Sequence, residues 1–194
     1  MARTIGLITE LEVVNSVLSV AGDAPIQSLA DTYQPATIIK QMIGNVSRKM
    51  QTKGYWFNQE YDVVLTANTL TGKIDLPFNT LKFEPADVSY VARGKTVYDR
   101  SNRTNTIAVD VVADLVYHLD FEELPQVARE FIRAACRLQY NNEYFGATEF
   151  KRELEADLIN AQQELDKADI ENEDISMFSA QRVNNIAFKN RRRN

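Results

Sequence analysis

Cysteine and histidine are almost absent from this chain, which contains one of each. Cys136 alone excludes a disulfide within the chain and a zinc site built from cysteines. His118 alone leaves the usual catalytic triads and histidine metal clusters without most of their residues. The sequence therefore predicts no metal site and no bound cofactor.

Glycine, proline and long apolar runs are also scarce. Seven glycines and five prolines in 194 residues are too few for a low-complexity chain, and no two glycines lie close enough to form a phosphate-binding loop. No run approaches the roughly 18 apolar residues of a membrane helix, and Glu10, Glu12 and Asp23 interrupt any signal-like segment. We expect no membrane association, and synthesis in the cytoplasm.

Hydrophobic residues make up 44% of the chain and charged residues 25%, as in ordinary globular domains. The net charge of -5 is distributed unevenly. Residues 181–194 carry five bases and no acid, so the remaining 17 bases face 27 acids, a net charge of -10. The negative charge of residues 1–180 repels a phosphate backbone. The basic tail could bind nucleic acid or an acidic protein groove, or simply remain in solvent.

Two helices are predicted at the beginning of the chain. Apolar residues recur at helical spacing over residues 9–21, and Thr9 with Glu12 has the form of a capping box. A second helix is expected to follow Pro35 and to end at Gly54. Both helices are predicted to have a structural role.

Residues 55–119 change to short runs rich in Val, Thr, Tyr and Phe, separated by turn signals. This pattern predicts an antiparallel meander. Glycine supplies the positive φ of a tight turn, so Arg93-Gly94-Lys95 is expected at a hairpin tip. The predicted strands are 57–66, 73–76, 88–92, 96–99, 107–112 and 115–119.

Helical spacing returns after Pro125, and a longer helix is expected to begin near Thr148. This longer helix has one narrow apolar stripe, and residues 149–174 contain ten acids and three bases, a net charge of -7. Like charges at i and i+4, such as Glu149 with Glu153, cost an isolated helix roughly a few tenths of a kcal/mol each. Because this charge does not stabilise the helix, a functional role is one explanation for it.

The predicted fold class is therefore α+β. It consists of four helices, an antiparallel β region inserted between the second and third helices, and a flexible C-terminal tail. The expected domains are an α-helical bundle of residues 1–54 and 123–176, an antiparallel β domain of residues 55–122, and a basic tail of residues 177–194.

Acid pairs are the only abundant catalytic material, for instance Glu122 with Glu123 and Asp110 with Asp114. Glycoside hydrolysis requires two carboxylates at a defined separation across a cleft, and neighbours in sequence do not establish that separation. We assign no catalytic residue, and we predict that the protein is not an enzyme.

Several strings carry a resemblance to a known family. The first helix has Asn15, Leu18, Gly22 and Pro25 in the arrangement Asn-x-x-Leu-x-x-x-Gly-x-x-Pro. Further strings are Lys53-Gly54 before Phe57-Asn58, Val97-Tyr98-Asp99-Arg100, Leu124-Pro125 before Arg129 and Ile132, and, most specifically, Gln139-Tyr140-Asn141-Asn142-Glu143-Tyr144-Phe145-Gly146-Ala147. Over roughly residues 7–175 the chain resembles the tail tubular protein A family, the head-to-tail adaptors of short-tailed podophages.

The chain departs from that family at one position. The family usually has Trp directly after the glycine that corresponds to Gly54, whereas here Tyr55 precedes Trp56. A shift of one position on a strand moves a side chain to the opposite face. Tyr55 is therefore the expected occupant of the family's core pocket.

The resemblance implies a ring of twelve subunits in the virion tail, between the portal protein and the tail nozzle, tail tubular protein B. DNA would pass through the lumen without specific binding. Acids around a lumen repel phosphates and let DNA slide. The expected channel-lining residues are Glu149, Glu153, Asp157 and Glu164, and a solvated outward face is the alternative.

The resemblance also implies contacts at both faces of the ring. By analogy with connectors whose C-terminal segment docks on the portal, the basic tail is expected to bind the portal protein. The hairpin turn and the string after it are expected to contact the nozzle or a neighbouring subunit. The portal-binding residues are Phe178, Arg182, Phe188, Lys189, Arg191, Arg192 and Arg193, and the nozzle or subunit-interface residues are Arg93, Lys95, Tyr98, Asp99 and Arg100.

Two other function classes stay open. A tail-associated glycan hydrolase using an Asp/Glu pair would have a cleft with two carboxylates at a suitable separation. A DNA-binding protein acting through the basic tail would bind DNA with a steep salt dependence.

Overall fold

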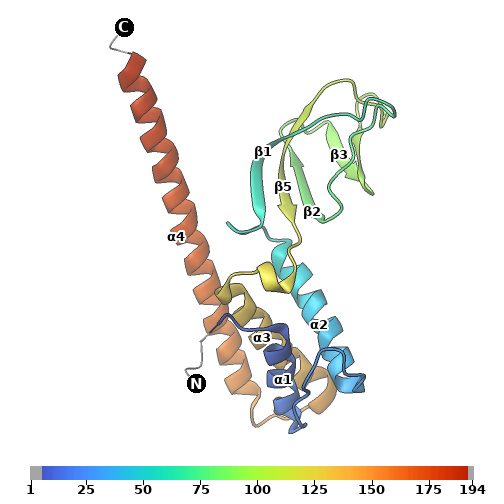
Figure 1. Ribbon diagram of the computed structural model, residues 1–194, viewed down its shortest axis with the longest axis vertical. Helices are drawn as coiled ribbons and strands as arrows, with labels where there is room; N and C mark the ends of the chain where they lie inside the picture. The colour runs from blue at the N-terminus through green and yellow to red at the C-terminus, as the bar shows by residue number, and fades with distance from the viewer. Residues whose placement is uncertain (1–5, 192–194) are drawn as a thin grey trace. The chain divides into compact units, whose positions relative to one another are not determined.

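The computed structural model describes residues 6–191, and for Phe145 and residues 174–191 it describes the backbone alone. The structure is α+β, with four helices and antiparallel strands between the second and third helices, as the sequence predicted (Figure 1). The chain forms two compact units: a helical unit of residues 1–43 and 125–194, and a β unit of residues 44–124. Residues 44–54, which the sequence-based division placed with the helices, group with the strands.

The helical unit contains most of the helices. α1 (Glu10–Leu18) continues into a short 3-10 turn, η1 (Ser19–Ala21), and α2 (Gln34–Gln51) begins in this unit. α3 (Gln126–Tyr140) is followed by a π-helical turn, η3 (Asn141–Phe145), and by the long helix α4 (Lys151–Arg191). α4 extends through much of the segment that the sequence assigned to the tail.

The ends of α1 follow from local side-chain chemistry. The predicted capping box is confirmed: the Thr9 N–H donates to the Glu12 carboxylate at 2.8 Å, and the Thr9 hydroxyl accepts from the Glu12 N–H at 3.3 Å. Gly22, with φ of 76°, ends the following turn in the left-handed region. Asn15 then bonds both backbone groups of Ile26, at 2.9 and 3.1 Å, and so holds the loop after α1.

The core of the helical unit is built from one face of each helix. α3 packs against α1 and α4 (Figure 1). The narrow apolar stripe of α4 is the face that packs, because Leu154, Ala161 and Leu165 are buried. The other main buried residues are Val13, Val14, Val17 and Leu18 of α1, Ile39 and Met42 of α2, and Ala128, Ile132 and Cys136 of α3.

The β unit contains two small antiparallel sheets. β1 (Gln59–Leu65), β5 (Val111–Tyr117) and β2 (Thr80–Pro85) form a three-stranded sheet in the order β1-β5-β2. β3 (Tyr90–Arg93) and β4 (Thr96–Asp99) form a two-stranded hairpin. Gly94 has φ of 62° in the turn between them, which confirms the predicted hairpin tip.

Three predicted strands differ from the structure. In the segment 73–76, Asp75 makes only an isolated bridge to Thr96, and Pro77 then ends the run. The predicted strands 107–112 and 115–119 are replaced by the single strand β5. In the sequence, Asp114 separates two apolar strand segments. In the structure its side chain lies at the outer face of the sheet, and its carboxylate accepts the Asp62 N–H at 2.9 Å.

Strand β2 was not predicted, because its exposed Lys82 and Glu84 and its final Pro85 are typical of a loop. The core of the β unit lies on one face of the central strand, where Val111, Ala113 and Leu115 alternate with more exposed residues. The other buried members of this core are Leu65, Ile74, Leu76, Val97 and Ile107.

Buried polar side chains join the end of α2 to the end of β5. Gln51 is fully buried, and its amide bonds both backbone groups of Leu119, at 2.8 and 3.0 Å. Asn58, which is 3% exposed, donates to the Tyr117 carbonyl at 2.7 Å and to the Gln51 carbonyl at 3.0 Å. The neighbouring Tyr55 is also buried, with 3% exposure, as the sequence predicted.

Candidate functional site

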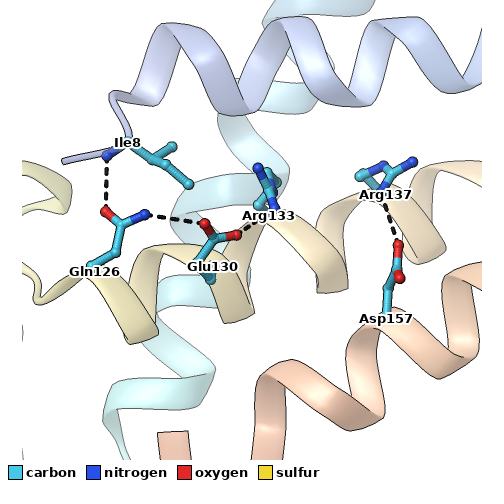
Figure 2. Close-up of polar contacts among 6 residues, drawn as sticks. All are labelled: Ile8, Gln126, Glu130, Arg133, Arg137 and Asp157. Atoms are coloured by element: carbon cyan, nitrogen blue, oxygen red, sulfur yellow. Dashed lines mark hydrogen bonds and ion pairs between the residues drawn. The ribbon is translucent and has the colours of Figure 1, made fainter. Parts of the chain in front are cut away.

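Acids on α4, and Glu149 just before it, are largely exposed. Glu149, Glu153 and Glu164, which are three of the expected channel-lining residues, are exposed to solvent. The fourth, Asp157, is half-buried and pairs with Arg137 of α3 at 3.0 Å (Figure 2). The Arg137 guanidinium therefore compensates part of the negative charge on this side of α4.

A groove of about 430 Å³ lies between α3 and α4. Arg133 at its wall pairs with Glu130 at 2.5 Å, and Gln126 donates to the same carboxylate at 3.1 Å (Figure 2). Both arginines that line the groove, Arg133 and Arg137, are thus paired with carboxylates. Its chemistry is that of a mixed polar surface and differs from a cleft with two unpaired catalytic acids.

The first turn of α3 fixes the segment that precedes α1. The Ile8 N–H donates to the Gln126 side chain at 2.9 Å, as Figure 2 shows. The Ile8 carbonyl accepts from the guanidinium of Arg129 at 2.7 Å, and Arg129 is only 2% exposed. Arg129, part of the string Leu124-Pro125-x-x-x-Arg129, therefore has a structural role in this chain.

The predicted nozzle or subunit-interface residues all lie in or beside the β3–β4 hairpin. The Arg93 guanidinium stacks 3.5 Å from the centre of the Tyr98 ring, a cation–π contact. Arg100 follows β4 and donates to the carbonyls of Val88 and Ser89. Arg93 and Lys95 flank the turn, so their charges lie at one end of the hairpin and that of Arg100 at the other.

Asp99 organises the loop that follows β4. Its carboxylate accepts the N–H groups of Ser101 and Asn102 at 2.8 and 2.9 Å, and the Asn102 side-chain amide at 2.7 Å. The bonds from Asn102, first from its backbone and then from its side chain, lower the pKa of the Asp99 carboxyl below its ordinary value. Asp99 is 7% exposed, and its hydrogen bonds to Ser101 and Asn102 hold the loop after β4, so its role in the hairpin is structural.

One member of each acid pair that the sequence offered for catalysis, Glu123 and Asp114, has a structural partner. Glu123 accepts the Asp120 N–H at 3.1 Å and caps a short 3-10 turn, η2 (Phe121–Glu123). Asp114 is bonded to the Asp62 backbone. Within residues 6–191, the described side chains contain no group of three or more His, Cys, Asp and Glu residues that could hold a metal ion.

The most specific family-like string, at residues 139–147, forms the end of α3 and the π-helical turn η3. Asn141 is 1% exposed and donates to the Ala147 carbonyl at 3.0 Å, while Gly146 ends the turn with φ of 71°. Tyr140 and Tyr144 stack with ring centroids 5.3 Å apart. The string therefore specifies a local backbone geometry, since each of these residues has a defined structural contact.

Exposed apolar residues form further candidate surfaces that the sequence analysis missed. Phe78 is 87% exposed in the β unit, and Ile159 and Ile170 of α4 are 57% and 61% exposed. The signal for the two isoleucines was present in the sequence, because both lie outside the narrow stripe that packs on α3.

The expected portal-binding residues lie outside the part of the chain for which side chains are described. They are Phe178, Arg182, Phe188, Lys189, Arg191, Arg192 and Arg193. Among the described residues, no helix has both the length and the apolar character needed to cross a membrane.

Comparison with known proteins gives one family and one relative. A family model described as tail tubular protein matches residues 11–175, which include most of both units. The chain is 28% identical over 126 residues to tail tubular protein A of Klebsiella phage KP34. This match covers 63% of the chain and 66% of the relative, so it spans just under two thirds of the relative's length.

Proposed function

Because the chain belongs to the tail tubular protein family, whose members are structural proteins of phage tails, we propose that it is a head-to-tail adaptor. In this proposal, twelve copies form a ring in the virion, and the ring joins the portal protein to the tail nozzle, tail tubular protein B. The observation that carries the proposal is the family match over residues 11–175.

DNA would pass through the lumen of this ring. The exposed acids Glu149, Glu153 and Glu164 are the proposed lining, with Asp157 contributing less because it is paired with Arg137. A negative wall repels phosphates, so DNA can slide without forming contacts that must be broken one by one. The protein would act by its geometry and charge, without catalysis and without a cofactor.

The contacts at the two faces of the ring are assigned to different parts of the chain. The basic segment 177–194 is the proposed portal-binding segment, since its bases and its Phe178 and Phe188 combine charge with apolar anchors. The β3–β4 hairpin, with Arg93, Lys95 and Arg100, is the proposed contact with the nozzle or with a neighbouring subunit.

Removing residues 177–194 tests this assignment. The shortened chain is expected to keep its fold, because the buried core residues of both units, among the side chains that the structure describes, lie before residue 166. It is also expected to lose binding to isolated portal rings, as measured by light scattering. Circular dichroism and the fluorescence of Trp56 serve as the control for folding. Undiminished portal binding by a folded, shortened chain would refute the portal-binding role of this segment.

A further inference from the structure

α4 is much longer than the helix that covers it. At about 1.5 Å per residue, the 41 residues of α4 extend about 60 Å and the 15 residues of α3 about 22 Å. Leu165 is the last buried residue of α4 among those whose side chains are described. From Asp166 to Glu173, where the description of side chains on α4 ends, no residue is buried, so this part of its surface is available to a partner.

One uncovered face of α4 combines apolar and acidic residues. Ile159 and Ile170 are eleven residues apart, which places them within about 20° of each other around a helix. Both are more than half exposed, and they lie away from the buried stripe of Leu154, Ala161 and Leu165. We call this surface the isoleucine face.

Acids lie along one side of the two isoleucines, and Lys167, three residues before Ile170, lies on the other side. Glu155 lies four residues before Ile159, Asp166 lies four residues before Ile170, and Glu173 lies three residues after Ile170. Residues at these spacings are neighbours on a helix surface. Glu155 also lies 3.9 Å from Lys151, but both side chains are half exposed, so this pair does little to neutralise the face.

A surface of the β unit has the complementary chemistry. Arg93 and Lys95 flank the hairpin turn, and the Lys95 carbonyl accepts the Leu76 N–H at 2.8 Å. That bond holds Leu76 beside the turn, and Phe78, two residues further along the chain, is 87% exposed. Aromatic residues and arginines in such positions are common anchors of protein interfaces. We call Phe78, Arg93 and Lys95 the hairpin surface.

We propose that the hairpin surface of one copy binds the isoleucine face of α4 in the next copy of the ring. Phe78 packs on the isoleucines, and Arg93 and Lys95 meet Glu155, Asp166 and Glu173. The contact is heterologous, so its repetition around an axis can close a ring. This inference rests on the proposed adaptor function, and it identifies the second copy as the partner of the hairpin.

Charge reversal in the full-length chain tests the contact. One variant carries Arg93→Glu and Lys95→Glu, a second carries Glu155→Lys and Glu173→Lys, and a third combines all four substitutions. The matched control carries Asp31→Lys and Glu171→Lys, which reverse the same number of charges at exposed positions outside both the isoleucine face and the proposed lining. Assembly on portal rings is measured by light scattering and by electron microscopy.

We expect each reversed variant to need about tenfold or more protein for ring assembly, because like charges then oppose each other. The combined variant and the control should assemble as the wild type does. Chemical coupling of amines to carboxylates in rings of mixed isotopic composition should also join Lys95 of one copy to Glu155, Asp166 or Glu173 of another.

Results that contradict the contact can be told apart from results that contradict the adaptor function. Normal assembly of both reversed variants, or failure of the combined variant to recover, would overturn the contact while the adaptor function stands. Equal loss in the control would also overturn it, because the effect would then follow from total charge. If the wild type formed no ring with portal, the adaptor function itself would fail.

Discussion

Replacement of Gln51 by methionine tests how the β unit is held together. The Gln51 amide donates to the Ser47 hydroxyl at 2.9 Å and to the Leu119 carbonyl at 3.0 Å, and it accepts the Leu119 N–H at 2.8 Å. Gln51 is fully buried. Methionine preserves the length and shape of the side chain, so Gln51→Met removes the three hydrogen bonds without creating a large cavity.

The expected cost follows from the groups that are left without a partner. A buried polar group that loses its hydrogen bond costs about 1–3 kcal/mol. Ser47 is 4% exposed, whereas Leu119 is half-buried, so water can replace part of what Leu119 loses. We expect Gln51→Met to lower the free energy of unfolding of the β unit by about 2–4 kcal/mol.

The fluorescence of Trp56 makes this measurement selective for the β unit. It is the only tryptophan of the chain and lies in the β unit, so its fluorescence during urea unfolding follows that unit. Circular dichroism at the same urea concentrations follows mainly the helices, and two separate transitions would show that the units unfold independently. Gln163→Met is the matched control, because Gln163 is exposed on α4. A loss below about 0.5 kcal/mol in Gln51→Met, or an equal loss in the control, would refute the reasoning.

Three further measurements probe other parts of the structure. Gly54 has φ of 83°, and an added Cβ would lie 3.1 Å from a Val116 methyl carbon. Gly54→Ala should therefore lower the free energy of unfolding of the β unit by about 1–2 kcal/mol in the same Trp56 assay, and an unchanged free energy would show that this position is not strained. Because the folded-state pKa of Asp99 is lowered, its contribution to stability is present above the unfolded value of about 4 and is lost as the pH falls through the folded value. Asp99→Asn should therefore flatten the acid side of the stability profile, and an unchanged profile would argue against this. Burial raises the pKa of the Cys136 thiol to about 12, so a thiol reagent at pH 8 should react with it only on unfolding, and rapid reaction of the native protein would show that the site is open.

Features that depend on neighbouring residues could be predicted from the sequence. The Thr9 capping box, the hairpin turn at Gly94 and the apolar stripe of α4 each need only a few residues within one element. The order of helices and strands followed from the change in apolar period along the chain.

Features that depend on distant residues could not be predicted. The bond between Gln51 and Leu119 joins residues 68 positions apart, and no local pattern identifies that pairing. Strand β2 is defined by its pairing with β5, although its own residues are typical of a loop. The same applies to the candidate site: the sequence identified Asp157 as an acid of the helix, but its pairing with Arg137 depends on how α3 and α4 pack.

The adaptor function is tested most directly by mixing the full-length protein with isolated portal rings. The mass of the product is measured by light scattering, and its shape is then examined by electron microscopy. The proposal predicts a ring of this protein bound to one face of the portal. A protein that stays monomeric and unbound over a wide range of salt and protein concentration would contradict it.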